Sequence, residues 1–353
     1  MEHIAIEECC DILDSRRIPI TASDRMSGPY PYYGANGVQD YVADYIFDDE
    51  LVLLAEDGGN FGSKTRPIAY RVSGKCWVNN HAHVLKPMAS MDVDYLCYSL
   101  MFYDTGELVN GATRQKLTQT AMRKMLIPQR SLQEQKRIVC ELSKVQSIIS
   151  ARQQQLQKLD ELVKARFIEL FGTIHDNRFG FSVVTLQDVS APIKDGTHQT
   201  PIYTTDAENG YKFLSSKDVT TGKVDWSHLK YIPEELHREL YARISPRKGD
   251  ILLAKNGTTG IAAIVDRDEV FDIYVSLALI RPHGVDSTYL WAAINAAETK
   301  QQFDASLKGI GVPNLHLGEI KKARIILPPM ELQEQFAAFV EQTDKSKLAV
   351  QKG

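Results

Sequence analysis

The phrase Leu132-Gln133-Glu134-Gln135 recurs 200 residues further along the chain as Leu332-Gln333-Glu334-Gln335. The same offset relates three pairs upstream of it, Gly111 with Gly311, Leu117 with Leu317 and Pro128 with Pro328. A constant offset over this length indicates an internal duplication. Each copy is predicted to be a globular domain that leads through a Pro-containing exit into a helix. Such an organisation suits a task performed twice, such as reading two half-sites.

The composition is that of a globular protein with two cores. The 353 residues are 43% hydrophobic, which is enough for two domains of ordinary size. No run of 18 apolar residues occurs, and no basic region leads into an apolar stretch at the N-terminus, so we expect neither a membrane span nor a signal peptide. The expected compartment is the cytoplasm. The five cysteines are odd in number and lack a CxxC spacing, which predicts reduced thiols and no metal site.

The charge balance limits any interaction with nucleic acid. Residues 1–130 hold 13 Lys and Arg against 17 Asp and Glu, residues 173–330 hold 18 against 19, and the whole chain has a net charge of -4. Neutralisation of phosphates by Lys and Arg supplies most of the non-specific affinity for DNA. Binding of DNA would therefore depend on local basic residues and on partner subunits.

The segment 1–130 is predicted to be β-rich, because short Val, Ile, Leu and Tyr runs alternate with turn-forming residues. The runs predicted as strands are 41–47, 51–54, 68–72 and 84–85, and residues 94–103 and 289–297 are predicted to be matching short helices. Residues 51–58 parallel residues 250–257, since each is an apolar strand that ends in an acidic or amide residue and Gly. Loops at strand ends commonly carry binding residues.

A long helix is predicted after Pro128, where the apolar period changes from two to that of a heptad. Ser131 and Glu134 have the spacing of a capping box, and Gly172 has the position of a C-cap. The seam positions alternate at spacings of four and three: Ile138, Leu142, Val145, Ile149, Arg152, Leu156, Leu159, Val163, Arg166 and Leu170. At about 1.5 Å per residue, roughly 40 residues span about 60 Å, so the helix is predicted to be a spacer.

The second copy is predicted to end in a shorter helix over residues 331–353, with Phe336, Phe339 and Val340 on its apolar side. The predicted organisation is therefore a first domain at 1–130, a spacer helix at 131–172, a second domain at 173–330 and the shortened helix at 331–353. If the helices pack antiparallel, the end near Gly353 should lie beside the middle of the first helix, which would leave the stretch from Ile138 to Ile149 without an intramolecular partner.

With these residues in view, the chain resembles the DNA specificity subunit of type I restriction-modification systems over essentially its whole length. The resemblance is carried by the Pro-rich helix entry at 326–335, by Tyr30-Pro31-Tyr32-Tyr33-Gly34-Ala35-Asn36-Gly37 in the first domain, and by Asp195-Gly196-Thr197-His198-Gln199-Thr200-Pro201 in the second. It implies an α+β fold in which two β-rich target recognition domains are joined by long antiparallel coiled-coil helices, with a pseudo-two-fold internal repeat.

The resemblance also implies the function and the partners. Each recognition domain would read one half of a bipartite double-stranded DNA target, and the helices would set the spacing and dock two methyltransferase subunits. Motor-nuclease restriction subunits would complete the complex. Apart from the resemblance, the heptad of the long helix makes the same helix of a second copy a candidate partner. No catalytic activity and no cofactor is expected in this chain; S-adenosylmethionine, ATP and Mg are expected in the partner subunits.

Motifs for an enzyme of its own are weak. The loop at 58–65 ends in Lys64-Thr65 like a phosphate-binding loop, but Ser63 stands where the second Gly is required. Residues 327–330 offer neither the amide nor the aromatic ring that adenine methylation uses to hold a flipped base. The alternative hypothesis is a two-headed coiled-coil scaffold that binds proteins without DNA specificity; steeply salt-dependent retention on DNA would distinguish the two.

Residue type and loop position select the candidate DNA contacts, because Arg and Lys reach guanine edges or phosphates and Asn can pair with adenine. The candidates are Asn60, Lys64, Arg66 and Arg114 in the first domain, and His198, Thr200, Lys217, Lys255, Asn256, Thr258 and Lys308 in the second. For each one, an ordinary solvated or turn-forming residue is the competing interpretation. The candidates for a subunit interface are the apolar positions Ile138, Leu142, Val145, Ile149, Phe336 and Phe339.

Overall fold

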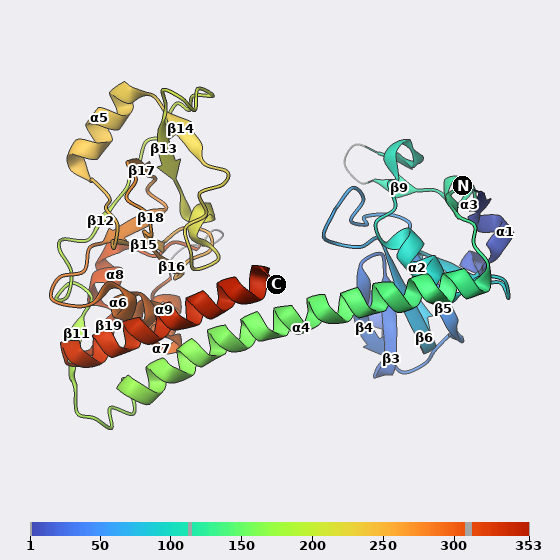
Figure 1. Cartoon of the computed structure of the whole chain (residues 1–353), viewed down its shortest axis with the longest axis horizontal. Coiled ribbons are helices and arrows are strands. Elements are labelled where there is room, and N and C mark those ends of the chain that lie inside the picture. The colour runs from blue at the N-terminus through green and yellow to red at the C-terminus, as the bar shows by residue number, and fades with distance from the viewer. Residues whose placement is uncertain (1, 112–114, 308–312, 353) are drawn as a thin grey trace. The chain divides into compact units, whose positions relative to one another are not determined.

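The structure of the chain is a computed structural model that describes residues 2–111, 115–307 and 313–352. It divides into two compact units at Ser150, within one long helix, α4 (Leu132–Phe171). Each unit contains a β-rich head, called head 1 (residues 2–130) and head 2 (residues 173–329), together with helical segments (Figure 1). The α+β fold class is as predicted. Among the described residues, no helix is long and apolar enough to cross a membrane.

Head 1 is built on a six-stranded sheet with the strand order β2-β7-β5-β6-β3-β4. Its central strand, β5 (Phe47–Ala55), has both faces buried, since Val52 and Leu54 pack into one core while Leu51 and Leu53 pack into another. Burial of both faces explains why the strand is a continuous apolar run. The other strands are β2 (Cys10–Ile12), β3 (Ser27–Gly34), β4 (Gly37–Val42), β6 (Ala69–Val78) and β7 (Ala82–Pro87).

Helix α2 (Val93–Met101) packs against this sheet, and its N-cap is Asp92, whose carboxylate accepts hydrogen bonds from the Asp94 and Tyr95 amides at 3.0 Å each. The chain leaves head 1 through β10 (Leu126–Pro128), which pairs antiparallel with β1 (His3–Ala5). The remaining elements are α1 (Ile6–Cys9), α3 (Gln119–Arg123), β8 (Val109–Asn110), β9 (Lys116–Leu117) and the 3-10 turns Asp14–Arg16, Ala22–Asp24 and Gly106–Leu108.

Head 2 repeats this plan with smaller sheets. In β15 (Ile251–Ala254), Ile251 and Leu253 face one core, and Leu252 and Ala254 face the other. The counterpart of α2 is α6 (Ser287–Asn295), and the exit strand β19 (Arg324–Leu327) pairs with β11 (Ser182–Thr185). The other elements are β12 (Lys194–Asp195), β13 (Tyr211–Leu214), the 3-10 turn Ser216–Val219, β14 (Lys230–Ile232), α5 (Glu234–Arg243), β16 (Ala262–Ile264), β17 (Phe271–Ile273), β18 (Leu277–Ile280), α7 (Ala297–Ser306) and α8 (Leu317–Lys322).

One predicted strand is wrong. Residues 41–47 are not a strand but the end of β4, a turn and the first residue of β5. Asp44 makes the turn, because its carboxylate accepts a hydrogen bond from the Tyr45 amide at 2.8 Å. The strands predicted at 51–54, 68–72 and 84–85 lie within β5, β6 and β7, except that β6 begins at Ala69, one residue after Ile68.

The predicted capping box and C-cap of the long helix are confirmed. The Ser131 amide donates to the Glu134 carboxylate at 3.0 Å, and the Glu134 amide donates to the Ser131 hydroxyl at 3.3 Å. At the other end Gly172 has φ +71°, and its amide donates to the Ile168 carbonyl at 2.8 Å. The left-handed backbone there is the conformation that favours glycine.

The second unit contains the C-terminal part of α4 and all of α9 (Met330–Lys352), which run antiparallel as expected. The Arg152 guanidinium donates to the Val350 carbonyl at 3.2 Å, and Lys347 pairs with Asp160 at 2.7 Å. Further along, the rings of Phe167 and Phe336 lie 5.5 Å apart. The order of these pairs, with low numbers on one helix opposite high numbers on the other, defines the direction.

The duplication is visible in the structure, but the predicted offset of 200 is wrong as a register. Leu117 is equivalent to Leu315, because the main-chain amide of each donates a hydrogen bond to the carbonyl that follows the central strand of its head. Pro128 is equivalent to Ile326, because the carbonyl of each accepts a hydrogen bond from a tyrosine hydroxyl. The true offset in this region is therefore 198. Gly311 lies outside the described residues.

Phe336, a candidate for the subunit interface, is instead part of the core of the second unit. It is fully buried and contacts the rings of Phe167 and Phe171. Phe339 is half-buried, with the Arg166 guanidinium 5.8 Å from its ring. The prediction of a subunit interface at Phe336 is therefore wrong. The ring is buried within the chain, because α9 packs with this side against α4 and the core of the second unit.

We expect the Phe336→Ala variant to lose about 3–5 kcal/mol of unfolding free energy, because a fully buried ring is replaced by a cavity. Urea unfolding of the full chain, followed by circular dichroism, measures the loss. Phe339→Ala is the matched control on the same helix and should lose clearly less. Equal losses would show that the two rings are equally buried.

Candidate nucleic-acid interface

Three loops of head 1 meet where β5 ends. After Ala55 the Glu56 carbonyl accepts a hydrogen bond from the Leu117 amide at 2.7 Å, and the Gly58 amide donates to the Gln115 carbonyl at 3.2 Å. The Asn36 side chain, from the turn between β3 and β4, donates to the Gly58 carbonyl at 3.0 Å. Two main-chain hydrogen bonds and one bond from the Asn36 side chain therefore hold three loops together at one end of the central strand.

Head 2 repeats the two main-chain contacts at the end of β15 (Ile251–Ala254). The Leu315 amide donates to the Lys255 carbonyl at 2.8 Å, and the Gly257 amide donates to the Pro313 carbonyl at 3.2 Å. A third segment joins them, since the Ser216 amide donates to the Ser276 hydroxyl at 2.9 Å and the Lys255 amide donates to the Ser276 carbonyl at 2.9 Å. The predicted parallel between residues 51–58 and 250–257 is confirmed at the strand end, because Glu56 and Lys255, and likewise Gly58 and Gly257, make equivalent main-chain bonds.

The candidate residues of head 1 lie in the loop between β5 and β6. Lys64 and Arg66 are exposed, and the Arg66 amide donates to the Ser63 hydroxyl at 2.9 Å, which shapes the backbone between them. Asn60 is half-buried, and its amide donates to the Pro67 carbonyl at 3.4 Å. Lys64 and Arg66 are therefore presented to solvent, while Asn60 helps to close the loop. Arg114 lies outside the described residues.

The candidate residues of head 2 divide by burial. His198, Thr200, Lys217 and Thr258 are exposed, and Asn256 is half-buried. Its side-chain oxygen and that of Asn314 are buried without a hydrogen-bond partner among the described residues, and the two residues face each other in an isolated β-bridge. Lys308 lies outside the described residues.

Lys255 is placed differently from the expectation. Its side chain is only 8% exposed, and its ammonium group lies 3.0 Å from the Asp195 carboxylate. The side chain therefore points into head 2 rather than toward solvent, because the residue continues the inward-facing pattern of β15. A direct contact of Lys255 with DNA has no support from this position; the pair with Asp195 instead links the strand end to the segment that carries His198.

Head 1 contains a matching cluster that was not predicted from the sequence. The residue equivalent to Lys255 is Glu56, which pairs with Arg17 at 2.6 Å and with Lys116 at 3.0 Å. Beneath it, buried His83 lies 2.6 Å from Asp14. The two heads thus use opposite charges at the same strand-end position. The sequence feature that could have revealed the cluster is a shared spacing of three residues, from Asp14 to Arg17 in head 1 and from Asp195 to His198 in head 2.

The head 1 cluster is better explained as an ion-pair network than as a metal site. Asp14, Glu56 and His83 place ligand atoms within 4.8 Å of one another. However, the Arg17 guanidinium already lies between the carboxylates, 2.6 Å from Glu56 and 3.5 Å from Asp14. Burial opposes ionisation of Asp14, but hydrogen bonds from His83, Val84 and Gln119 outweigh it, so the pKa of Asp14 is lowered.

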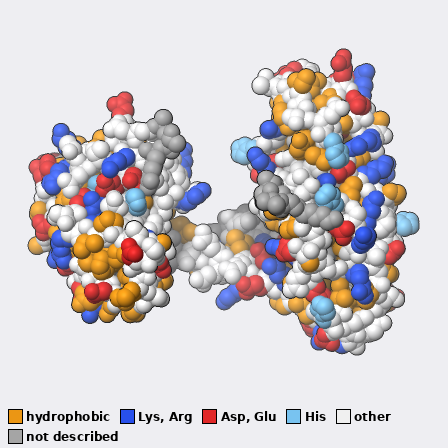
Figure 2. Space-filling view, turned by 180° about the vertical axis from the view of Figure 1, so that it is seen from behind, with side chains coloured by type: hydrophobic (Ala, Val, Ile, Leu, Met, Phe, Trp, Pro, Cys, Tyr) orange, Lys and Arg blue, Asp and Glu red, His pale blue; other side chains and the backbone are white. Residues whose placement is uncertain are grey.

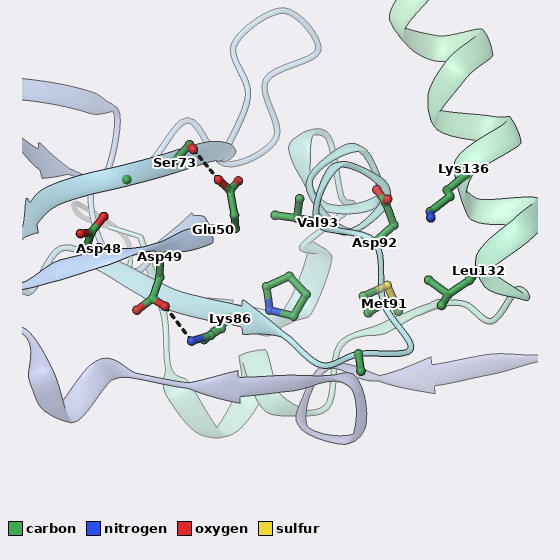
Figure 3. Close-up of a pocket in the computed structure, with 13 residues that line it drawn as sticks. Asp48, Asp49, Glu50, Ser73, Lys86, Met91, Asp92, Val93, Leu132 and Lys136 are labelled. Atoms are coloured by element: carbon green, nitrogen blue, oxygen red, sulfur yellow. Dashed lines mark hydrogen bonds and ion pairs between the residues drawn. The ribbon is translucent and has the colours of Figure 1, made fainter.

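The opposite end of β5 has a different character. A depression of about 680 Å³ lies there, and its lining residues, drawn in Figure 3, include Asp48, Asp49 and Glu50 together with Lys86 and, from α4, Lys136. Asp49 pairs with Lys86 at 2.6 Å. Because carboxylates repel phosphates, this acidic end of the sheet is unsuited to DNA. On the face drawn in Figure 2, basic and acidic side chains are interspersed on both units, in keeping with the nearly balanced charge counts.

Gly196 lets the His198 segment pack tightly on β17. A Cβ atom at this position would lie 1.9 Å from the Ile273 carbonyl oxygen, so another side chain would force the two strands apart. Beside it lies Asp272, whose carboxylate is 2.7 Å from His237. Burial raises the pKa of Asp272 to about 6, from an ordinary value of 3.8, despite the neighbouring imidazole.

Similarity to known proteins identifies the family of the chain. The family model of the type I restriction modification DNA specificity domain matches residues 1–161 and again residues 180–353. The chain therefore belongs to this family, and it does so twice over. It is a specificity subunit of the type I restriction-modification kind: a non-catalytic component that recognises DNA sequence through two such domains.

Individual relatives are distant but extend over nearly the whole chain. A candidate type I restriction enzyme specificity subunit of Haemophilus influenzae is 27% identical, and the alignment covers 99% of this chain and 89% of that protein. A type I restriction enzyme specificity subunit of Methanocaldococcus jannaschii is 24% identical, with 97% and 86% covered.

Two solved structures share the fold. The type I restriction-modification S subunit from M. genitalium matches with a TM-score of 0.55 at 14% identity, covering 99% of this chain and 91% of the other. A chain from a structural study of complex assembly in a type I system matches with a TM-score of 0.51 at 16% identity, covering 99% and 92%.

The raised pKa of Asp272 predicts a pH dependence of stability. A carboxylic acid with a raised pKa in the folded state contributes stability that is complete below pH 3.8 and is lost as the pH rises through about 6. We expect the difference in unfolding free energy between Asp272→Asn and wild type to shift in favour of the variant over this window, because the amide still accepts from His237 but does not ionise. Urea unfolding at several pH values measures the difference; parallel profiles would contradict the assignment.

Proposed function

We propose that each head reads one half of a bipartite double-stranded DNA target with the three loops at the end of its central strand. The observation that carries the proposal is the repetition of this main-chain arrangement in both heads with different side chains on it. Glu56, Asp57 and Lys116 in head 1 correspond to Lys255, Asn256 and Asn314 in head 2. A shared framework with different side chains suits two related domains that read different sequences.

The balanced charge of the heads supports a division of labour with partners. The chain has a net charge of -4, so its own phosphate contacts supply limited affinity. We propose that two methyltransferase subunits dock on the helices and supply further DNA contacts as well as the chemistry. In this proposal S-adenosylmethionine is bound by those subunits, and ATP and Mg by motor-nuclease restriction subunits that join the complex.

Reconstitution with the cognate methyltransferase subunit tests the proposal. The complex should methylate adenine at a split target, which sequencing of methylated adenines would identify, whereas the isolated chain should neither methylate nor cut DNA. Retention on DNA should fall steeply with salt. Binding of S-adenosylmethionine by the chain alone would contradict the assignment of the chemistry, and salt-insensitive retention would favour a protein-binding scaffold.

Substitutions in one head should affect one half-site. We expect Lys64→Ala combined with Arg66→Ala to weaken reading of one half of the target, and Lys217→Ala combined with Asn256→Ala to weaken reading of the other, with a loss of about 1–3 kcal/mol for each base contact. Competition binding of the reconstituted complex to targets altered in either half measures this. A loss that is uniform across all sequences would mean that these side chains contact only phosphates.

The first half of α4 is the candidate docking surface for a subunit. Ile138 is half-buried against the core of head 1, but Leu142, Val145 and Ile149 are 40%, 52% and 45% exposed. Burying an apolar side chain of this kind stabilises an interface by about 1.5–3 kcal/mol. The heptad spacing of the three residues favours a helix of a methyltransferase subunit, or of a second copy of this chain, as the partner.

We expect Leu142→Glu combined with Val145→Glu to abolish co-purification with the methyltransferase subunit or self-association of the chain, because charge would enter an apolar seam. Gln146→Glu, an exposed neutral-to-acidic change on the same helix, is the matched control. Pull-down and sedimentation measure the two kinds of assembly, and circular dichroism confirms that both heads remain folded. Undiminished assembly by both measures would show that this seam is not an interface.

A further inference from the structure

One buried glutamine ties the start of α4 to head 1. Gln135 is 1% exposed, and its side-chain oxygen accepts a hydrogen bond from the Asp92 amide at 2.7 Å. Its side-chain nitrogen donates to the Ser90 carbonyl at 3.0 Å and to the Arg130 carbonyl at 2.9 Å. The first turn of the helix is thus bonded both to the N-cap of α2 and to the exit segment that precedes α4.

The second unit has the same contact. Gln333 is 1% exposed; its oxygen accepts from the Asp286 amide at 2.9 Å, and its nitrogen donates to the Pro328 carbonyl at 2.8 Å. Asp286 is the N-cap of α6, as Asp92 is the N-cap of α2. We call Gln135 and Gln333, each with its partners, the glutamine anchors.

The anchors explain why the repeated phrase and the repeated structure differ by two residues. Gln135 is the last letter of the first Leu-Gln-Glu-Gln phrase, whereas Gln333 is the second letter of the other copy. The remaining glutamines of the two phrases, Gln133 and Gln335, are exposed. The buried contact, rather than the position in the phrase, is therefore what the two halves share.

The glutamine anchors bond to main-chain groups, so they hold the direction of each helix whatever side chains its head carries. A primary amide offers one acceptor and two donors in a plane, so it fixes the direction of the helix as well as its distance. The neighbouring tyrosines reinforce this junction: the Tyr95 hydroxyl donates to the Pro128 carbonyl at 2.8 Å, and Tyr289 makes the same bond to Ile326. An apolar side chain could fill the space but could not set the direction.

We propose that Gln135 and Gln333 are positioning residues that set the angle between each head and its helix, and so select the gap that is accepted between the two halves of a target. The inference rests on the proposed reading of split targets. Helix α4 is unbroken from Leu132 to Phe171. Variation in the angle between a head and its helix at either anchor would therefore widen the range of gaps at which both heads can bind one target.

A spin-label measurement tests the angle within the first unit. Cys140 on α4 is exposed, while Cys9, Cys10, Cys76 and Cys97 are buried, so a label can be placed on Cys140 and on Thr120→Cys in α3 of head 1. We expect Gln135→Ala to broaden the distance distribution between these labels, whereas the matched control Gln133→Ala leaves it unchanged. A narrow distribution in Gln135→Ala would overturn the proposal.

The functional readout is the tolerance to the gap. The complex reconstituted with its methyltransferase subunit should methylate a target of native gap in preference to targets longer or shorter by one base pair. Each hydrogen bond of an anchor changes an equilibrium by a factor of roughly 2 to 10. We therefore expect Gln135→Ala to reduce the preference about tenfold while leaving the base preference within each half-site unchanged; Gln133→Ala should match wild type.

The outcomes separate the two proposals. An unchanged gap preference in Gln135→Ala overturns the inference, even where the wild-type complex reads a split target. Absence of methylation at any split target by the wild-type complex overturns the proposed function, and the spin-label distribution then still decides whether Gln135 sets the angle. If Gln135→Ala fails to fold, Gln135→Glu replaces it, since the carboxylate keeps the acceptor but loses both donors.

Discussion

The attachment of each helix to its head is the constraint on which the rest of this molecule depends. A helix of 40 residues with charged and polar residues on most of its surface gains its stability from packing along one side. In head 1 this packing is Ile138 and Val139 on the core below α2; in the second unit it is Phe167 and Phe171 against Phe336. Both junctions also satisfy buried main-chain groups, through Gln135 and Gln333, which would otherwise be costly to bury.

The strand-end loops are also held by hydrogen bonds between main-chain groups. In each head one main-chain hydrogen bond joins a distant loop to the end of the central strand: the Leu117 amide donates to the Glu56 carbonyl in head 1, and the Leu315 amide donates to the Lys255 carbonyl in head 2. Once the backbone is satisfied in this way, the side chains are free to differ. The opposite charges of Glu56 and Lys255 show how far they do, since each is neutralised by a partner from the start of its own head, Arg17 or Asp195.

Recognition without catalysis follows from the family to which the chain belongs. In two buried polar clusters the imidazole lies within hydrogen-bond distance of a carboxyl group of the same head, as with His83 and Asp14 at 2.6 Å and His237 and Asp272 at 2.7 Å. A chain of this family supplies recognition to a larger enzyme. The exposed stripe of Leu142, Val145 and Ile149 leaves apolar surface on the first half of α4, and this is the surface that we propose as a docking site for a subunit.

The sequence by itself determined the duplication, the heptad helix with its capping box, the strand end at 250–257 and the family, because each depends on local spacing or on short-range hydrogen bonds. It did not determine the register: the letters of the phrase repeat at 200, but the buried glutamines Gln135 and Gln333 repeat at 198, since a buried amide is defined by its partners and not by its neighbours in the chain. Nor could it show that Lys255 and Phe336 point inward. Their direction depends on which residues from distant segments, Asp195 for one and Phe171 for the other, complete the space around them, and only tertiary packing decides that.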